Sequence, residues 1–211
     1  MTAILDRLRQ RVRLAPRRLV LCEVDDPRVV RAADRLARER LADVTLLGSR
    51  EAARRTARSA DLPLTGVALA DSAEASEIER TSRALQEVRG DRLGSAALDS
   101  LARDPLFQAA ARVRAGLADC FVAGASRTSA DVLRSALWLI GLSHGFTRVS
   151  SFFLMVFPAR GGAGERAMVF ADCGVVPDPD APQLAEIGIL AADHFARLTG
   201  EVPHTAFLSF S

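Results

Sequence analysis

Short apolar runs alternate along the chain with longer segments whose apolar residues recur at helical spacing. Apolar runs of a few residues flanked by turn residues indicate buried strands, whereas apolar residues at i, i+3 and i+4 indicate amphipathic helices. Strands are predicted over residues 17–24, 43–48, 66–71, 119–124, 148–157, 167–173 and 204–210. Helices are predicted over residues 27–41, 50–59, 75–89, 107–115, 129–142 and 183–198. This alternation predicts a three-layer α/β/α fold with a mainly parallel sheet, because helices join parallel strands and cover both faces.

The regular alternation stops at 158-PARGGAGER-166, a turn that lies between two predicted strands with no helix between them. A Pro- and Gly-rich turn in that position predicts an antiparallel hairpin. The change suggests a new domain, with its boundary near 143-SHGFTR-148. Residues 1–145 are therefore predicted to form most of a first α/β domain, and residues 146–211 the start of a second one.

The segment 120-CFVAGASRTSADVLRSALWLIGL-142 predicts a buried strand, a tight turn and a helix. The first four residues are apolar and too few for a helix, and Gly124 breaks the run. Residues 128–131 form a start signal that resembles a capping box, and apolar residues follow at helical spacing.

Arg134 lies one turn into this predicted helix. In open α/β sheets such a junction lies at the carboxyl edge, where free N–H groups and the positive end of the helix dipole attract anions. The arginine fork can bind a phosphate there through two hydrogen bonds. A surface arginine that is solvated or paired with an acidic residue is the alternative, and the spacing alone does not exclude it.

The amino-acid composition bears on whether the chain binds nucleic acid. The chain has 211 residues, 49% of them hydrophobic, which is enough for a real core. All 28 basic residues are arginine, yet 26 acidic residues leave a net charge of only +2. The two signs alternate along predicted helices, as in 27-PRVVRAADRLARERL-41, which is typical of a solvated helix face. We therefore predict no nucleic-acid partner.

The thiols and imidazoles do not show the spacing of a metal site. The cysteines lie in or beside apolar runs, so buried reduced thiols are predicted at Cys22, Cys120 and Cys173. Structural or solvent roles are predicted for His144, His194 and His204. The N-terminus lacks an apolar signal core, and no run approaches about 18 apolar residues. These features predict a cytoplasmic protein with no metal and no membrane segment.

Several segments together resemble one family. They are 19-LVLCEVDDPRVVRAA-33, 104-DPLFQAAARVRAGLADCFVAGASRTSADVLRSAL-137, 150-SSFFLMVF-157, 169-VFADCGVVPDPDAPQLAEIGILAA-192 and 206-AFLSFS-211. In this order, the motifs are similar to those of the phosphate acetyltransferase (phosphotransacetylase) family over nearly the whole chain. The resemblance implies a fold like that of isocitrate and isopropylmalate dehydrogenases, and a homodimer. It also implies reversible acetyl transfer between coenzyme A and phosphate, with acetyl-CoA, CoA and acetyl phosphate as substrates and no metal or bound cofactor.

The resemblance also assigns roles to two arginines. The arginine that matches Arg134, in the Ala-Asp-Val-Leu-Arg motif, belongs to the family's active-site cleft, where it helps to bind the phosphate-bearing substrate. Arg89, in 86-QEVRGDRLG-94, resembles the second family arginine, although the local spacing is shorter than in the family. The solvated end of a helix is the alternative interpretation of Arg89.

The chemistry calls for fixed cations and hydrogen-bond donors, because acetyl phosphate is a dianion and thiolate attack builds charge on a carbonyl oxygen. Ser126, Thr128 and Ser129 are candidate auxiliary donors, although Thr128 or Ser129 is alternatively engaged in capping the helix. Asp172, in the Phe-Ala-Asp motif, is predicted either to orient a cationic neighbour or to accept purely structural hydrogen bonds.

The sequence also departs from the family pattern. The usual Pro-Glu-Gly is Cys22-Glu23-Val24, Arg127 replaces a histidine, and Ser135 replaces a proline. Family members continue after Leu-Ser-Phe-Ser with a Thr-Lys-Gly-Ser loop, and later carry an Asp-Leu-Ser-Arg-Gly segment that supplies much of the catalysis. The chain is thus expected to be a truncated form that is inactive by itself. The alternatives are a phosphate butyryltransferase, and a non-catalytic regulatory module that binds CoA or an acyl phosphate.

Overall fold

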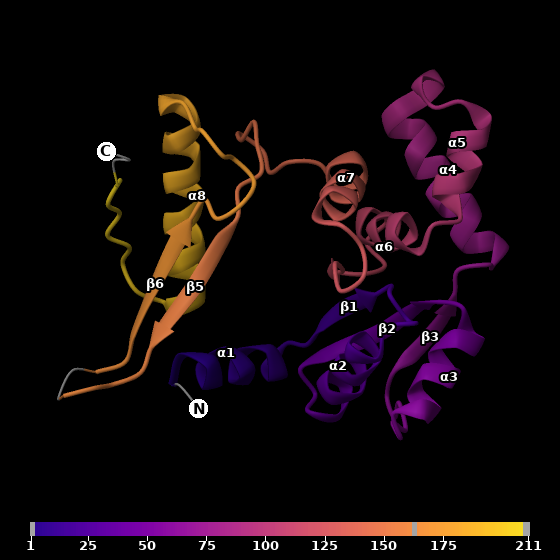
Figure 1. The fold of residues 1–211 in the computed structure, drawn as a ribbon, viewed down its shortest axis with the longest axis horizontal. Coiled ribbons are helices and arrows are strands. Elements are labelled where there is room, and N and C mark those ends of the chain that lie inside the picture. Colours follow the sequence, from indigo (N-terminus) through magenta and orange to yellow (C-terminus); the bar gives the residue numbers. More distant parts are fainter. Residues whose placement is uncertain (1–2, 162–163, 209–211) are drawn as a thin grey trace. The chain divides into compact units, whose positions relative to one another are not determined.

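A computed structural model describes residues 3–161 and 164–208. The chain divides into two compact units: the larger is Val12–Gly141, and the smaller combines Met1–Arg11 with Leu142–Ser211. Figure 1 shows the elements of both units, and each unit is described by itself. The division into a first domain over residues 1–145 and the start of a second domain over residues 146–211 stays a prediction.

A parallel sheet of four strands lies at the centre of the larger unit. Its strand order is β3-β2-β1-β4, and Leu19 of β1 pairs with Val44 of β2 on one side and with Cys120 of β4 on the other. The strands are β1 (Arg17–Leu21), β2 (Ala42–Gly48), β3 (Ala68–Asp71) and β4 (Cys120–Val122). The helices are α2 (Pro27–Arg38), α3 (Arg50–Ser59), α4 (Ala75–Arg89), η1 (Gly90–Arg92, a 3-10 turn), α5 (Ser95–Ala102), α6 (Pro105–Arg114) and α7 (Ser129–Leu139).

Different helices bury the two faces of this sheet, because successive side chains of a strand point in opposite directions. Leu19 and Leu21 lie in one apolar cluster with Val30 of α2 and with alanines of α3. Val20 lies in a second cluster with Leu106 of α6. The parallel strand pairings and these two clusters confirm a mainly parallel sheet with helices on both faces, as the alternation of the sequence predicts.

A further apolar cluster lies among the helices of the larger unit. Leu85 of α4, Phe107 of α6 and Leu139 of α7 are buried together. Trp138 packs against this cluster, with its ring edge-on to that of Phe107 at a centroid distance of 6.0 Å. Each fully buried side chain of this size contributes about 1.5–3 kcal/mol. The cluster therefore fixes the position of α7 relative to α4 and α6.

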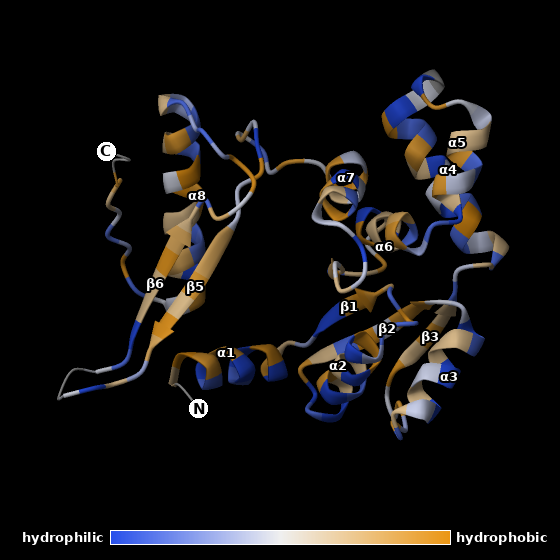
Figure 2. Ribbon diagram, viewed as in Figure 1, coloured by the Kyte–Doolittle hydropathy of each residue, from blue (hydrophilic) through white to orange (hydrophobic). Residues whose placement is uncertain are grey.

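In the smaller unit, an antiparallel hairpin packs against a long helix. β5 (Phe152–Phe157) and β6 (Arg166–Ala171) pair with each other, and α8 (Ala181–Thr199) packs on β6. This pairing confirms the predicted hairpin. Figure 2 shows hydrophobic residues along both strands. α8 begins with a capping box between Asp180 and Gln183.

The first helix, α1 (Ala3–Leu14), begins in the smaller unit. Its first N–H groups, those of Ala3 and Ile4, donate to the Glu165 carboxylate at 2.9 and 2.7 Å. A carboxylate at this position satisfies unpaired N–H groups and complements the helix dipole.

The structure corrects the predicted strand at residues 204–210. Residues 204–208 form no strand, and the rest of the predicted strand lies outside the described residues. A strand needs a hydrogen-bonded neighbour, and β5 and β6 pair only with each other among the described residues. Among residues 3–161 and 164–208, no helix is long and apolar enough to cross a membrane.

The structure also corrects the predicted burial of the cysteines. Cys22 is buried, which raises the pKa of its thiol to about 12, but Cys120 and Cys173 are exposed. Cys120 begins β4, an edge strand of three residues, and Cys173 follows the end of β6. An apolar sequence around a cysteine buries it only where another layer covers that position.

Candidate substrate-binding site

The turn between β4 and α7 is built around the carboxylate of Glu23. Oε2 accepts hydrogen bonds from the N–H groups of Gly124 and Ala125 at 2.8 and 3.0 Å. Oε1 accepts from the N–H groups of Ser126 and Arg127 at 2.6 and 2.8 Å, and from Ser126 Oγ at 2.9 Å. Glu23 follows β1, and the parallel pairing of β1 with β4 brings the two carboxyl ends together. We call residues 124–127 with the Glu23 carboxylate the Glu23 cradle.

The Glu23 carboxylate is charged although Glu23 is only 8% exposed. Burial raises its pKa, but the hydrogen bonds from Ser126, Ala125 and Arg127 outweigh burial and lower the pKa overall. The four N–H groups of the turn therefore already hold an anion that belongs to the chain. The sequence predicts that donors at this edge attract a substrate anion, but these four are occupied, and substrate binding there falls to side chains.

Two further contacts fix the same turn. Arg28 donates to the carbonyl oxygen of Ala125 at 2.5 Å while it pairs with Asp26 at 2.6 Å. Arg127 forms an ion pair with Asp104, the residue that caps α6. The turn is thus held by its N–H groups, by a carbonyl group and by one of its side chains.

The three predicted hydroxyl donors have different environments. Ser126 donates to Glu23. Thr128 is the N-cap of α7: its Oγ1 accepts from the N–H of Asp131 at 3.1 Å and donates to the carboxylate of the same residue at 2.7 Å. Ser129 is the first residue of α7, is exposed, and makes no hydrogen bond through its hydroxyl within the part of the chain that the structure describes. Of the three hydroxyls, that of Ser129 is the one left free for a ligand.

Arg134 lies on α7, and its side chain is 49% exposed. Its guanidinium pairs with Asp131, one turn earlier, at 2.5 Å. An exposed pair at this spacing contributes about 0.3–0.5 kcal/mol. A phosphate that offers two charged oxygens can replace Asp131 at little cost, so this arrangement fits both a surface ion pair and an anion-binding residue.

Arg89 is the last residue of α4, and its guanidinium lies 4.1 Å from the centroid of the Trp138 ring. Its Nε is buried and has no hydrogen-bond partner among the described residues. Trp138 follows Arg134 by four residues on α7, a spacing that places two side chains on the same face of a helix. Arg89 thus contacts α7 one turn after Arg134, although the two arginines lie far apart in the sequence.

Asp172 belongs to the smaller unit and is surrounded by its own loop. Its carboxylate accepts from the N–H and the hydroxyl of Ser151, and from the N–H groups of Gly174, Val175 and Val176. Burial raises the pKa of Asp172, but these hydrogen bonds lower it well below the usual range. No cation contacts this carboxylate among the described residues. These contacts therefore fit the interpretation that Asp172 accepts structural hydrogen bonds rather than orienting a cationic neighbour.

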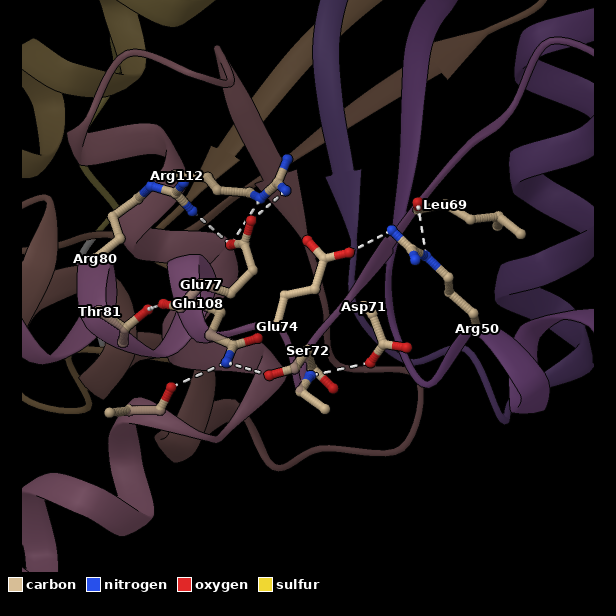
Figure 3. Close-up of polar contacts among 12 residues, drawn as sticks. Arg50, Leu69, Asp71, Ser72, Glu74, Glu77, Arg80, Thr81, Gln108 and Arg112 are labelled. Carbon is tan, nitrogen blue, oxygen red and sulfur yellow. Dashed lines mark hydrogen bonds and ion pairs between the residues drawn. The ribbon is translucent and has the colours of Figure 1, made fainter.

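The buried carboxylate of Glu77 joins α4 and α6 (Figure 3). Glu77 pairs with Arg80 at 2.6 Å and with Arg112 at 2.5 Å. Burial raises the pKa of Glu77, but the two arginines lower it overall. Next to it, Gln108 donates to the carbonyl oxygens of Ser72 and Ala102, both at 2.9 Å. These contacts connect the end of β3 with α4, α5 and α6; α4 carries Arg89, and α4 and α6 pack on α7.

Within residues 3–161 and 164–208, no group of three or more His, Cys, Asp or Glu side chains is arranged to hold a metal ion. The larger unit offers arginines and a hydroxyl that can bind an anion.

Comparison with known proteins identifies the family. The family model described as "Phosphate acetyl/butaryl transferase" matches residues 3–211. The chain belongs to this family. A phosphate acetyltransferase from Paracoccus denitrificans is 43% identical over 98% of this chain and 62% of its own length. Another from Acetivibrio thermocellus is 35% identical over 99% of this chain and 63% of its own.

Solved phosphotransacetylases have the same fold as this phosphate acetyl/butyryl transferase chain. The enzyme from Streptococcus pyogenes superposes with a TM-score of 0.88 at 31% identity, over 100% of this chain and 63% of its own. The EutD phosphotransacetylase from Staphylococcus aureus superposes with a TM-score of 0.81 over 92% of this chain. The chain therefore spans less than two thirds of the length of these relatives and matches their N-terminal part.

Sequence reasoning missed Glu23 and Trp138 as parts of the candidate site of this family member. Glu23 follows a predicted strand, which is a signal for a residue at the carboxyl edge, but its partners lie about a hundred residues later. Trp138 occupies the spacing expected of a buried helix face, and nothing local shows that an arginine from α4 covers it.

Proposed function

We propose that this chain is part of a phosphate acetyltransferase, which transfers an acetyl group reversibly between acetyl-CoA and phosphate to give acetyl phosphate and CoA. The family supports this proposal, as do the names of the relatives from Paracoccus denitrificans and Acetivibrio thermocellus. The observation that carries it is the contact of Arg89 with Trp138, one turn after Arg134 on α7. Two arginines placed in this way suit a substrate with a dianionic phosphate.

In the proposed reaction, the thiolate of CoA attacks the acetyl carbon of acetyl phosphate. A carbon–sulfur bond forms, the bond between that carbon and the phosphate oxygen breaks, and phosphate leaves with the electron pair. Arg134 exchanges Asp131 for the phosphate, and Arg89 supplies a second cation. Ser129 adds a hydroxyl donor at the start of α7. Fixed cations of this kind stabilise charge that grows in the transition state.

The proposal includes CoA as a substrate, no metal or bound cofactor, a homodimer, and a cytoplasmic location. The family description covers acetyl and butyryl transfer, and the names of the relatives favour the acetyl group. No finding favours a non-catalytic CoA-binding module.

The test is the formation of acetyl-CoA from acetyl phosphate and CoA, followed by the absorbance of the thioester. The chain is compared with the same chain extended by the segment of the Paracoccus denitrificans relative that lies beyond the match. We expect turnover by the extended chain and little by the 211 residues alone. In the extended chain, Arg134→Ala should lower turnover by about 10²-fold, the range seen when one charge-stabilising donor is lost.

Absence of turnover in an extended chain that is folded would contradict the proposed function. Robust turnover by the 211 residues would show that the groups needed for the chemistry lie within them. Unchanged turnover in Arg134→Ala would assign Arg134 to the surface ion pair with Asp131.

A further inference from the structure

Trp138 is held firmly by its own neighbours. The residue after it, Leu139, is fully buried, and the ring of Phe107 meets the indole at an interplanar angle of 65°. Both residues belong to the apolar cluster among α4, α6 and α7, against which Trp138 packs. The indole is therefore part of a rigid surface on α7 and not a mobile side chain.

The guanidinium of Arg89 lies over this surface. Its central carbon is 4.1 Å from the centroid of the ring, which is within the range of a cation–π contact. No ion pair to Arg89 is found among the side chains that the structure describes, whereas Arg134 pairs with Asp131 and Arg127 pairs with Asp104. Arg89 thus contacts an aromatic ring, and no carboxylate among the described side chains pairs with it.

The contact with Trp138 is not a hydrogen bond, so it does not use the N–H groups of Arg89; Nε is buried, and the two Nη atoms carry the other N–H donors. A long side chain loses rotamer freedom when it is fixed, at a cost of about 2 kcal/mol for arginine. If the ring already restricts the Arg89 side chain, less rotamer entropy is lost when a ligand binds. The Nη groups can then form two hydrogen bonds with a phosphate.

We propose that Trp138 is a positioning residue that holds the Arg89 guanidinium ready to bind a phosphate group of the substrate. This role rests on the proposed function, because it assumes that Arg89 binds a phosphate-bearing ligand. The phosphate has two possible sources, acetyl phosphate with inorganic phosphate on one side and the phosphates of CoA on the other. Trp138 acts through Arg89 and does not itself touch the ligand.

The chain offers a direct reporter for this contact. Trp138 is its single tryptophan, and it contains no tyrosine, so its near-ultraviolet-excited emission comes from the residue under Arg89. Replacing the cation by a neutral side chain in Arg89→Gln should shift the emission of the ligand-free chain. The control is Arg83→Gln, which removes an exposed arginine of α4 that pairs with Glu79. If Arg89→Gln and Arg83→Gln both give the emission of the wild type, the contact is absent in solution and the proposal is wrong, whatever the protein binds.

Binding is measured by titration calorimetry of the 211-residue chain with inorganic phosphate, acetyl phosphate and CoA, each in a separate experiment. We expect Trp138→Leu to raise the Kd of the ligand that Arg89 contacts by about tenfold, which corresponds to about 1.4 kcal/mol, and Trp138→Phe to restore part of the affinity. Leu137→Ala, an exposed neighbour on α7, is the control and should leave each Kd unchanged. The ligand whose Kd responds identifies the source of the phosphate.

The outcomes separate this proposal from the proposed function. If the wild type binds a phosphate ligand and Trp138→Leu binds it equally well, the positioning role is wrong and the proposed function stands. If the wild type binds none of the three ligands, Arg89 is not held ready for a phosphate and the positioning role is wrong, whereas the proposed function is decided by the turnover of the extended chain. A Kd raised equally in Trp138→Leu, Trp138→Phe and Leu137→Ala would mean general damage to α7, and it would also refute the specific role of the ring.

Discussion

Replacement of Glu23 by glutamine should destabilise the larger unit strongly, although the change is nearly isosteric. Each carboxylate oxygen of Glu23 accepts at least two hydrogen bonds from the turn at residues 124–127. Glutamine retains one acceptor oxygen and replaces the other with an NH₂ group, which can only donate. At least two backbone N–H groups therefore lose their acceptor and face another donor.

The magnitude follows from the cost of unpaired donors. A buried donor without a partner costs about 1–3 kcal/mol, so two of them cost about 2–6 kcal/mol. Glu23 is only 8% exposed, so water replaces the lost oxygen poorly. A whole domain is typically stable by about 5–15 kcal/mol. The variant should consequently lose a large fraction of the stability of the larger unit.

Urea unfolding measures this loss, with the fluorescence of Trp138 reporting on α7 and circular dichroism on all helices. Glu79→Gln is the matched control, because it removes the same charge from a side chain that is 73% exposed and paired with Arg83 at 3.4 Å. That exposed pair should contribute less than about 1 kcal/mol. Equal unfolding midpoints for the two variants would refute the reasoning, because they would show that the turn finds other acceptors when Glu23 is lost.

The remaining predictions concern two other carboxylates. The pKa of Asp172 is lowered in the folded chain, so the stability that its charge provides is complete above its unfolded pKa of about 3.9 and is lost as the pH falls through its lower folded value. Asp172→Asn should therefore weaken the dependence of the urea midpoint on pH below about 4, and equal dependence in both proteins would contradict this. Arg112→Gln leaves buried Glu77 with only Arg80 and should cost about 2–3 kcal/mol of unfolding free energy. Arg103→Gln, on a surface pair, is the control, and an equally small effect of both changes would refute the estimate.

Much of the fold could be predicted because its signals are local. The helix α2 begins where Asp26 precedes Pro27, and α7 begins where Thr128 caps the chain, both of which the sequence shows directly. The helix α6 begins at Pro105, shortly before its predicted start at residue 107. The hairpin of β5 and β6 follows from its turn. In contrast, α5 is a helix of only eight residues, too short for its apolar spacing to stand out, and residues 204–208 have a strand-like pattern but no partner strand among those described.

The candidate site could be predicted only in part, for a physical reason. The sequence indicates Arg134 because strand, turn and helix start are contiguous. The cradle depends on β1 and β4 being neighbours in the sheet, and the pairing of Arg89 with Trp138 depends on how α4 packs on α7. Both are tertiary contacts between segments that are distant in the sequence, and no local spacing records them.

In both units, a carboxylate that follows a strand accepts hydrogen bonds from the backbone of a turn. Glu23 follows β1 and Asp172 follows β6, and each carboxylate collects the N–H groups of a nearby turn. Such clusters of N–H groups are anion sites in many proteins, but here the anion is internal and permanent. On the proposed function, recognition of phosphate then depends on side-chain cations such as Arg89 and Arg134. The two carboxylates fix the backbone, and these cations remain free to exchange one partner for another during the reaction.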